Sequence, residues 1–343
     1  MTVSVLGTTE VEVRAPSRLH FGLLAAHGPG ARQFGGVGAM IDQPGLWIRI
    51  RSASQMQVSG RHQGRTEQFV QRFLASTQLE EPRCHIEILQ AASEHVGLGT
   101  GTQLALAVAS GLVAFLGHRP LDPAQLAAAT GRGLRSSIGS HGFRAGGLLL
   151  DLGKSQGDGL STLGDRASLP EDWRWLLIRP RGEKGLSGPP EQCAFQQLPV
   201  VPSRVSQELA EEIHEWMFPA ARAGDPKAFG ESIYRYGVRA GACFASQQAG
   251  SFATHRLAQI VARCRDAGVS GVGQSSWGPT VFALFENEAA ALSFEEGAES
   301  WLSQGDLHWM LAEPNNCGAT ISVDEKPIPP SAEGLCSVEG QKS

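Results

Sequence analysis

The spacing of apolar side chains predicts the secondary structure of the first part of the chain. Apolar and polar residues alternate over 11–15 and again over 46–50, as they do in strands that bury one face. Residues 1–51 are therefore expected to be mainly β structure. Further along, the apolar pattern predicts helices over 65–78, 100–116 and 122–130 and strands over 85–89 and 147–152. The helix over 100–116 carries almost no charge, which predicts burial on nearly all sides.

The second part of the chain begins after a polar, glycine-rich stretch over 153–172, which marks a candidate domain boundary. The apolar pattern then predicts strands over 173–178, 280–285, 307–312 and 319–323 and helices over 203–222, 226–247, 253–267 and 288–303. This order predicts a split βαβ unit with helices on one face of an antiparallel sheet. The expected fold class is α+β, with domains over 1–165 and 166–325 and a mobile tail over 326–343.

Composition narrows the classes of function. The 343 residues are 41% hydrophobic and 18% charged, as in ordinary globular proteins. The net charge of −5 is opposite to that of nucleic-acid binders, so an anionic ligand must be held by local groups. The longest uncharged apolar run, 104–117, is shorter than the ~20 residues that cross a bilayer, and residues 1–13 do not resemble a signal peptide. We expect a cytoplasmic protein with no nucleic-acid or membrane partner.

The six cysteines are scattered and contain no CxxC pair. This pattern predicts reduced thiols and no zinc site.

The strongest local motif is the segment 95–103, His-Val-Gly-Leu-Gly-Thr-Gly-Thr-Gln, which follows a predicted strand and opens the long apolar helix. Glycines allow close approach of the backbone to a ligand, and the first N–H groups of a helix attract anions. The candidate phosphate-binding residues are Gly97, Gly99, Thr100, Gly101 and Thr102, and Gln103 is a candidate substrate contact. The alternative is a glycine-rich turn that only allows a tight connection between strand and helix.

Two further glycine-rich segments are candidates for contact with a ligand. The segment 131–147 combines three arginines, including Arg135, with serines and His141. Arginine and glycine together favour contact with a polyanion, although a solvated basic loop is the commoner outcome. In the segment 271–280, Ser275 and Ser276 lie just before a predicted strand, and this segment either closes over a ligand or makes a turn.

Near the start of the chain, Arg18 and His20 lie two residues apart in an extended segment, so their side chains share a face. A lone histidine in such a place is more often structural than catalytic. The loop over 182–191 is long, rich in glycine and contains Glu191; such loops often cover sites.

Taken in order, these segments resemble the superfamily of galactokinase, homoserine kinase, mevalonate kinase and phosphomevalonate kinase (GHMP). They resemble more closely one unusual family within it, the β-ribofuranosylaminobenzene 5′-phosphate synthases. The resemblance covers roughly residues 10–325 and is carried by the segments 17–22, 34–38, 95–103, 135–147 and 271–280. Two positions depart from the synthase pattern: Thr100 replaces a usual Ser and keeps the hydroxyl, and Ser137 replaces a usual Gly.

The resemblance implies a ribosomal S5-like N-terminal domain, a ferredoxin-like C-terminal domain and a homodimer. It also implies a reaction of phosphoribosyl pyrophosphate with a para-substituted benzoate, either 4-aminobenzoate or 4-hydroxybenzoate. The products are a C-riboside 5′-phosphate, CO2 and pyrophosphate, in the biosynthesis of tetrahydromethanopterin-type carriers. Mg2+ is the expected cofactor, with unknown ligands.

On this reading, the segment 97–102 binds pyrophosphate, while Arg18, His20 and Arg135 neutralise charge and orient the substrates. His141, Ser275 and Ser276 are further substrate contacts. Asp151, at the end of a predicted strand, is either a contact to metal or ribose or a structural cap.

An ATP-dependent kinase on the same scaffold is the main alternative, and a silent nucleotide-binding protein is a third. In many kinases of the superfamily a catalytic Asp stands where this sequence has Gly139, and their early Lys is replaced by Ser17 and Arg18. Attack by an aromatic carbon needs no base to deprotonate a hydroxyl, so these replacements favour the synthase.

Overall fold

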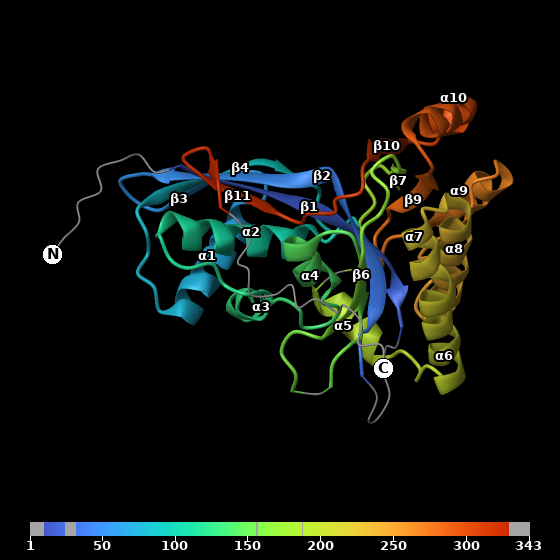
Figure 1. Ribbon diagram of the computed structural model, residues 1–343, viewed down its shortest axis with the longest axis horizontal. Coiled ribbons are helices and arrows are strands. Elements are labelled where there is room, and N and C mark those ends of the chain that lie inside the picture. The colour runs from blue at the N-terminus through green and yellow to red at the C-terminus, as the bar shows by residue number, and fades with distance from the viewer. Residues whose placement is uncertain (1–9, 25–31, 156, 187, 329–343) are drawn as a thin grey trace, which may run out of the picture.

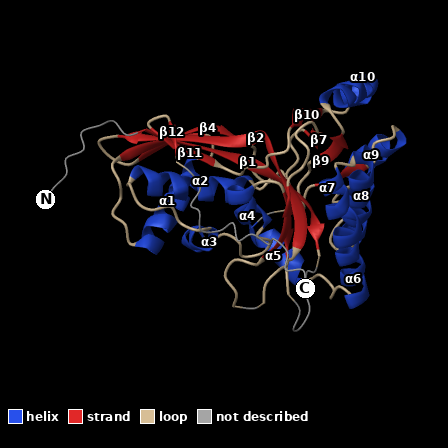
Figure 2. Cartoon of the chain, in the orientation of Figure 1, coloured by secondary structure: helices blue, strands red, loops and turns tan. Residues whose placement is uncertain are grey.

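The computed structural model describes residues 10–24, 32–155, 157–186 and 188–328 (Figure 1). Two sheets meet near the middle of the molecule, and helices pack against both of them (Figure 2). The predicted α+β class is confirmed. The expectations of β structure over 1–9 and of a mobile tail over 329–343 lie outside the described residues.

The first sheet has the strand order β12-β11-β1-β2-β4-β3, and β5 pairs with both β2 and β6. Its strands are β1 (Glu10–Leu23), β2 (Gly36–Ser52), β3 (Gln57–Gly60), β4 (Cys84–Ala91), β5 (Leu148–Asp151), β6 (Leu163–Ala167), β11 (Thr320–Val323) and β12 (Lys326–Pro327). The helices α1 (Gln63–Thr77), α2 (Thr100–Phe115), α3 (Pro123–Thr130) and α4 (Ile138–Ala145) lie on one side of this sheet (Figure 1). As its uncharged sequence predicts, α2 is buried along most of its length.

The second sheet has the order β10-β7-β9-β8, with all neighbours antiparallel. Its strands are β7 (Arg174–Pro180), β8 (Gly271–Gln274), β9 (Val281–Phe285) and β10 (Leu307–Ala312). In order along the chain this is fourth, first, third, second, which is the ferredoxin-like order and confirms the split βαβ prediction. The accompanying helical segments are α5 (Gly188–Gln196), α6 (Ser203–Glu211), the π-helix η1 (Glu212–Met217), α7 (Phe218–Ala223), α8 (Pro226–Ala242), α9 (His255–Asp266) and α10 (Glu288–Gln304).

Helices contact both faces of the second sheet, so the expectation of helices on one face was wrong. Leu176 and Ile178 of β7 pack with α9 and α10, whereas Trp175 and Leu177 pack with α8. Because successive residues of a strand face opposite sides, a strand that is apolar throughout must be covered twice. Within the described ranges, no helix is long and apolar enough to cross a membrane.

Some segments that the sequence analysis assigned to loops or to the second unit belong to the first sheet and its helices. Helix α4 lies within the glycine-rich segment 131–147, and β6 lies in the expected boundary stretch. Strand β11 was expected beside the second sheet but pairs with β1, where Val11 is opposite Val323. This pairing satisfies the hydrogen bonds of the β1 edge, a constraint that is not visible in local sequence. β12 extends it into the expected tail, and the exact domain limits stay a prediction.

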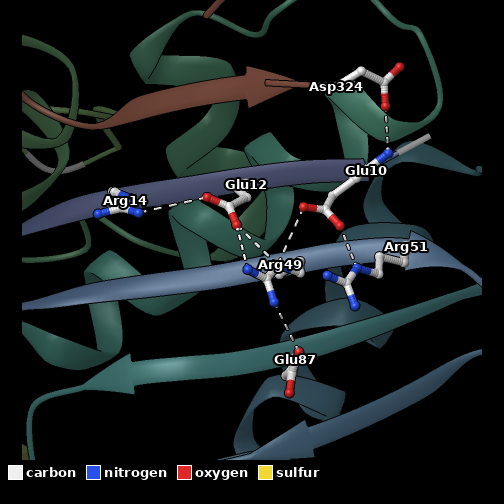
Figure 3. Close-up of polar contacts among 7 residues, drawn as sticks. All are labelled: Glu10, Glu12, Arg14, Arg49, Arg51, Glu87 and Asp324. Carbon is white, nitrogen blue, oxygen red and sulfur yellow. Dashed lines mark hydrogen bonds and ion pairs between the residues drawn. The ribbon is translucent and has the colours of Figure 1, made fainter. Parts of the chain in front are cut away.

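Ion pairs cross the outer face of the first sheet (Figure 3). Arg49 on β2 lies 2.8 Å from Glu12 on β1 and 3.8 Å from Glu87 on β4. Glu10 contacts both Arg49 and Arg51. Such partly exposed pairs contribute little individually. They leave the opposite face of the strands, with residues such as Val13 and Ile48, to the helix-covered core.

The two halves of the molecule are joined by β1, which runs through both cores. Its first half packs under α2, and Leu19 and Phe21 of its second half pack against the second sheet. The ring of Phe21 lies 5.2 Å from that of Phe282 and 5.9 Å from that of Trp175. Residues of β1 between these two cores therefore lie at the domain junction.

A second junction joins the loop before α2 to the loop after β8. Thr280 Oγ1 donates a hydrogen bond to Val96 O at 2.6 Å, and Ser275 Oγ donates to Gly97 O at 2.7 Å. A Cβ on Gly278 would lie only 2.2 Å from Gly97 N. The two loops approach this closely because neither carries a side chain at the contact.

Substitution of Gly278 should therefore weaken the junction. Gly278→Ala forces the backbones apart, and we expect it to lower the free energy of unfolding by about 1–3 kcal/mol, the usual cost of overpacking. Gly297→Ala on α10 is the matched control, because no atom lies within 4 Å of the new Cβ. The control should be neutral or stabilising by up to about 1 kcal/mol. Urea denaturation measures both, and equal stabilities of the two variants would contradict this packing.

Candidate functional site

A cavity of about 280 Å³ lies at the domain junction. It is bounded by β1, by the turn between α3 and α4, by the end of α8 and by the loop after β8. Its walls differ in character: arginines and hydroxyls gather on one part, and aromatic and small side chains on another. This combination suits a ligand that has both an anionic and an apolar portion.

Arg18 and His20 both line this cavity, so the prediction that they share a face of β1 is confirmed. Backbone hydrogen bonds fix their positions from both domains. Arg18 N donates to Leu98 O at 3.0 Å, His20 N donates to Ser275 Oγ at 3.0 Å, and Ser276 N donates to His20 O at 2.9 Å. The two side chains are thus held by the glycine loop before α2 and by the loop after β8.

Arg18 presents a cation with unused hydrogen-bonding capacity. Its Nε is buried and has no hydrogen-bond partner. Burial lowers the pKa of Arg18 to about 10, with Glu191 opposing and Arg135 adding to this change. Arg135 itself lies 2.7 Å from Glu191. Because Arg18 lines the cavity and stays charged at neutral pH, its guanidinium can pair with an anion bound there.

Arg132 is a second cation of this kind, and the sequence analysis did not single it out. It lines the cavity, and its buried Nε has no hydrogen-bond partner. Burial lowers its pKa to about 10, and the neighbouring Arg65 and Arg72 add to the effect. The available signal was its position between Gly131 and Gly133, which both have positive φ (64° and 69°).

His20 is buried, and its Nε2 lies 3.1 Å from Ser136 Oγ. Burial and the charge of Arg18 lower the pKa of His20 well below its usual value of 6.5. The imidazole is therefore neutral at physiological pH. It lines the cavity as a neutral hydrogen-bonding group, which differs from the charge-neutralising part of its expected role.

Asp151 is fully buried and does not line the cavity. Its carboxylate accepts hydrogen bonds from Ser137 N at 2.5 Å and Gly153 N at 2.8 Å. The hydroxyl of Ser161 donates to the same carboxylate, and that of Ser136 lies 3.5 Å from it. These contacts hold the turn that starts α4, so they favour the structural alternative considered for Asp151.

The residues of the glycine-rich loop before α2 lie in different surroundings. Of its five candidate phosphate-binding residues, Thr102 lines the cavity. Gly97 has a φ of 88° and packs against Gly278. Thr100 Oγ1 donates to Ser93 O at 3.2 Å. The loop is thus part of the domain junction as well as the start of α2.

The other two glycines of the loop make room for arginines. A Cβ on Gly99 would lie 3.2 Å from Arg18 Cβ, and one on Gly101 would lie 2.3 Å from Arg65 Nη2. Gly99 also caps α2 in a left-handed conformation (φ 71°), and it has no side chain that could bond to the helix. Two cations, Arg18 and Arg65, thus lie at the start of α2, where the free N–H groups and the helix dipole also favour an anion.

The remaining predicted substrate contacts are only partly at the cavity. Ser276 lines it. His141 does not, and its Nε2 donates to Ser161 O at 2.8 Å. Gln103 Nε2 donates to Gly139 O at 2.9 Å, and Gln103 lies away from the cavity lining. Ser275 is fully buried, and its hydroxyl bonds across the domain junction. The structure thus brings together Arg18, His20, Arg135, Thr102 and Ser276.

The apolar part of the cavity contains Phe244 and Trp277, whose rings lie 5.2 Å apart in an edge-to-face arrangement. Gln248 lines the cavity beside them. Its Nε2 donates to Gly241 O at 3.1 Å and to Gly250 O at 2.9 Å, which fixes the orientation of the amide. Its Oε1 is buried and has no partner. A ligand with a hydrogen-bond donor on an aromatic ring would satisfy this oxygen after a movement of the side chain that exposes it to the cavity.

The donor set does not fit a Mg2+ ion held by the protein. Across the described residues, no three His, Cys, Asp or Glu side chains gather in a possible metal site. Glu191, the carboxylate of the cavity wall, is bound to Arg135. The oxygens of Asp151 are occupied by backbone and hydroxyl donors. Magnesium normally takes one or two free carboxylates in addition to phosphate oxygens.

Comparison with known proteins confirms the resemblance found in the sequence. Residues 217–303 match the family model of the GHMP kinases C terminal. A β-ribofuranosylphenol 5′-phosphate synthase of Methanothermobacter thermautotrophicus is 29% identical to the chain, over 81% of the chain and 90% of its own length. A protein of the same name from Archaeoglobus fulgidus is 29% identical over 91% of the chain and 100% of its own length. The chain is thus related to enzymes along most of its length.

Solved structures agree on the fold. Homoserine kinase from Cytophaga hutchinsonii superposes with a TM-score of 0.63 at 15% identity, covering 94% of this chain and 100% of its own. Phosphomevalonate kinase from Streptococcus pneumoniae gives 0.63 at 13% identity, covering 90% of this chain and 100% of its own. At this identity the likeness concerns architecture alone, and it confirms the GHMP kinase-like fold.

The neutral, buried His20 predicts a loss of stability in acid. Its pKa is lower in the folded protein than the usual 6.5, so the unfolded chain binds more protons below that pH. The free energy of unfolding should fall as the pH drops below about 6.5, by up to ~1.4 kcal/mol per pH unit for this group. His20→Gln should make that dependence shallower. Urea denaturation of both proteins over a pH series measures it, and parallel curves would contradict a neutral imidazole.

Proposed function

We propose that the chain catalyses decarboxylating transfer of phosphoribosyl from phosphoribosyl pyrophosphate to a para-substituted benzoate. The products would be a C-riboside 5′-phosphate, CO2 and pyrophosphate. The observation that carries this proposal is the presence of Arg18, Arg132 and Arg135 in the lining of a cavity that also contains Phe244 and Trp277. A phosphorylated sugar and an aromatic acid are together the kind of substrates that such a cavity accommodates.

The chemistry places two demands on the site. The C1–O bond of the ribose breaks with its electron pair leaving on pyrophosphate, and the ring carbon that bears the carboxylate forms the new bond to C1. The bond to the carboxylate then breaks, its electron pair restores the aromatic ring, and CO2 departs. The site must therefore stabilise the leaving anion and hold the ring in line with C1. Arginines supply the first requirement, and the Phe244–Trp277 wall supplies the second.

The identity of the benzoate is suggested by two observations. The relatives are named for a ribofuranosylphenol, a product whose ring carries a hydroxyl. In this chain, Gln248 Oε1 offers an unsatisfied acceptor at the aromatic part of the cavity. We therefore favour 4-hydroxybenzoate over 4-aminobenzoate, with its phenolic O–H donating to Gln248. This hydrogen bond would also make the ring more electron-rich at the attacking carbon.

The sequence of bond changes requires no general base, which separates the proposal from a kinase. Phosphoryl transfer to an alcohol needs a group that orients the hydroxyl and accepts its proton. Asp151 is bound to backbone N–H groups. Gly139 has no side chain, and a Cβ added to it would lie 3.3 Å from Thr102. Neither position offers a carboxylate to the cavity.

Several parts of the expected function stay predictions. Because the cavity lacks a free carboxylate, we propose that magnesium enters the cavity already bound to phosphoribosyl pyrophosphate. The homodimer, the cytoplasmic location and the place in tetrahydromethanopterin biosynthesis likewise stay predictions.

The direct test is a reaction of purified protein with phosphoribosyl pyrophosphate, Mg2+ and carboxyl-labelled 4-hydroxybenzoate. We expect labelled CO2 and pyrophosphate in equal amounts, and a lower rate with labelled 4-aminobenzoate. A parallel incubation with ATP and a panel of alcohols, including homoserine and mevalonate, should give no phosphorylated product. Absence of CO2 together with stoichiometric phosphorylation of an alcohol would replace the synthase with a kinase.

The contact to Gln248 can be tested through ligand preference. In the wild-type protein, 4-hydroxybenzoate should bind about ten-fold more tightly than benzoate, because only the former donates to Gln248 Oε1. Gln248→Leu should reduce this ratio to about one, and calorimetry measures it. A general distortion of the loop would weaken both ligands equally and leave the ratio intact, and that result would contradict the assignment. Gln247→Leu serves as the control in the same loop.

A further inference from the structure

A second group of arginines is centred on Arg132, which lines the cavity. Arg65 and Arg72 come from α1, and Arg132 comes from the turn after α3. The guanidinium carbon of Arg132 lies 4.6 Å from the centre of the Phe69 ring, and that of Arg65 lies 5.6 Å from the same ring. One buried aromatic side chain thus gathers two of the three cations.

The backbone is shaped to admit these arginines. A Cβ on Gly101 would lie 2.3 Å from Arg65 Nη2, and a Cβ on Gly131 would lie 2.6 Å from Arg72 Nη1. Both guanidinium groups therefore pack against a main chain that carries no side chain at the contact.

The charge of this group is poorly compensated. Glu94 lies 2.9 Å from Arg65 and is the carboxylate paired with it. Arg132 has a buried Nε without a partner. Of the neighbouring cations, Arg65 and Arg72 act on the pKa of Arg132, whereas Arg135 acts on that of Arg18. Of this group, Arg132 lines the cavity, and Arg65 and Arg72 lie close enough to act on Arg132 without lining the cavity themselves.

We infer that Arg132, supported by Arg65 and Arg72, binds the pyrophosphate group of the sugar substrate, and that Arg18 and Arg135 bind the second anionic group in the cavity. This inference rests on the proposed function. Pyrophosphate carries the highest charge among the reacting groups and needs the larger excess of cations. Arg65 also packs on Gly101 in the first turn of α2, so this group of arginines adjoins N–H groups that favour an anion.

In this arrangement, Arg132 contacts the leaving group directly, and Arg65 and Arg72 hold additional positive charge behind it. Arg18 and Arg135 together have a smaller excess of positive charge, since Glu191 is paired with Arg135. That smaller excess suits a group of lower charge, such as the 5′-phosphate or the benzoate carboxylate. The two groups of arginines would thus orient the sugar with its C1–O bond toward α2.

Binding of sodium pyrophosphate, without any sugar or benzoate, tests the subsite separately from catalysis. Isothermal titration calorimetry of Arg132→Gln should show about a 10- to 100-fold loss of affinity relative to wild type. Arg132→Lys should keep part of the affinity, because lysine retains the positive charge but lacks the paired N–H donors of the guanidinium. Arg72→Gln, at an exposed position, should lose a few-fold. Arg204→Gln is the control, since it removes one exposed, ion-paired arginine of α6.

The outcomes separate the two proposals. Loss of affinity in Arg132→Gln and Arg72→Gln but not in Arg204→Gln supports the subsite, even if labelled CO2 is never released by the wild type. Equal affinities in Arg72→Gln, Arg132→Lys and the control would overturn it, even if the wild type releases CO2. The affinity for 4-hydroxybenzoate should be unchanged in Arg132→Gln, and a parallel loss of benzoate affinity would also overturn the assignment to pyrophosphate.

Discussion

The contact between two glycines, Gly97 and Gly278, determines where the walls of the cavity stand. The backbones of the two loops touch there, and the hydroxyls of Ser275 and Thr280 bond across the same junction. Ser275 also accepts the backbone N–H of His20, so the loop of the second domain positions the strand that carries the first domain's polar residues. Any increase in the separation of these loops would move Arg18 and His20 relative to the arginines beside α2.

The cavity wall contains charged arginines whose burial favours the neutral form. Burial lowers the pKa of both Arg18 and Arg132, yet both remain charged at neutral pH because arginine is so strongly basic. Their unpartnered Nε atoms carry a desolvation cost that neighbouring carboxylates do not remove. A bound polyanion would remove it. A site of this kind gives up stability in the free protein and gains affinity for the ligand.

Local sequence was sufficient for most helices and strands and for the candidate region. The uncharged run of α2, the Asp-Pro start of α3 and the alternation in β1 each carry their own signal, and the shared face of Arg18 and His20 followed from the last. Long-range partners were not visible. Three features depend on residues that are distant in the chain: the pairing of β11 with β1, the hydrogen bonds that occupy Ser275, and the position of Arg65 and Arg72 near Arg132.

The central claim is that an aromatic carbon replaces pyrophosphate on the ribose. Carbon NMR of the product formed from phosphoribosyl pyrophosphate labelled with ¹³C at C1 and 4-hydroxybenzoate labelled with ¹³C in the ring tests it most directly. We expect a one-bond coupling between the two labels, in a product that has lost its carboxylate. A product that keeps its carboxylate and joins ribose to the ring through oxygen, with no such coupling, would contradict the account.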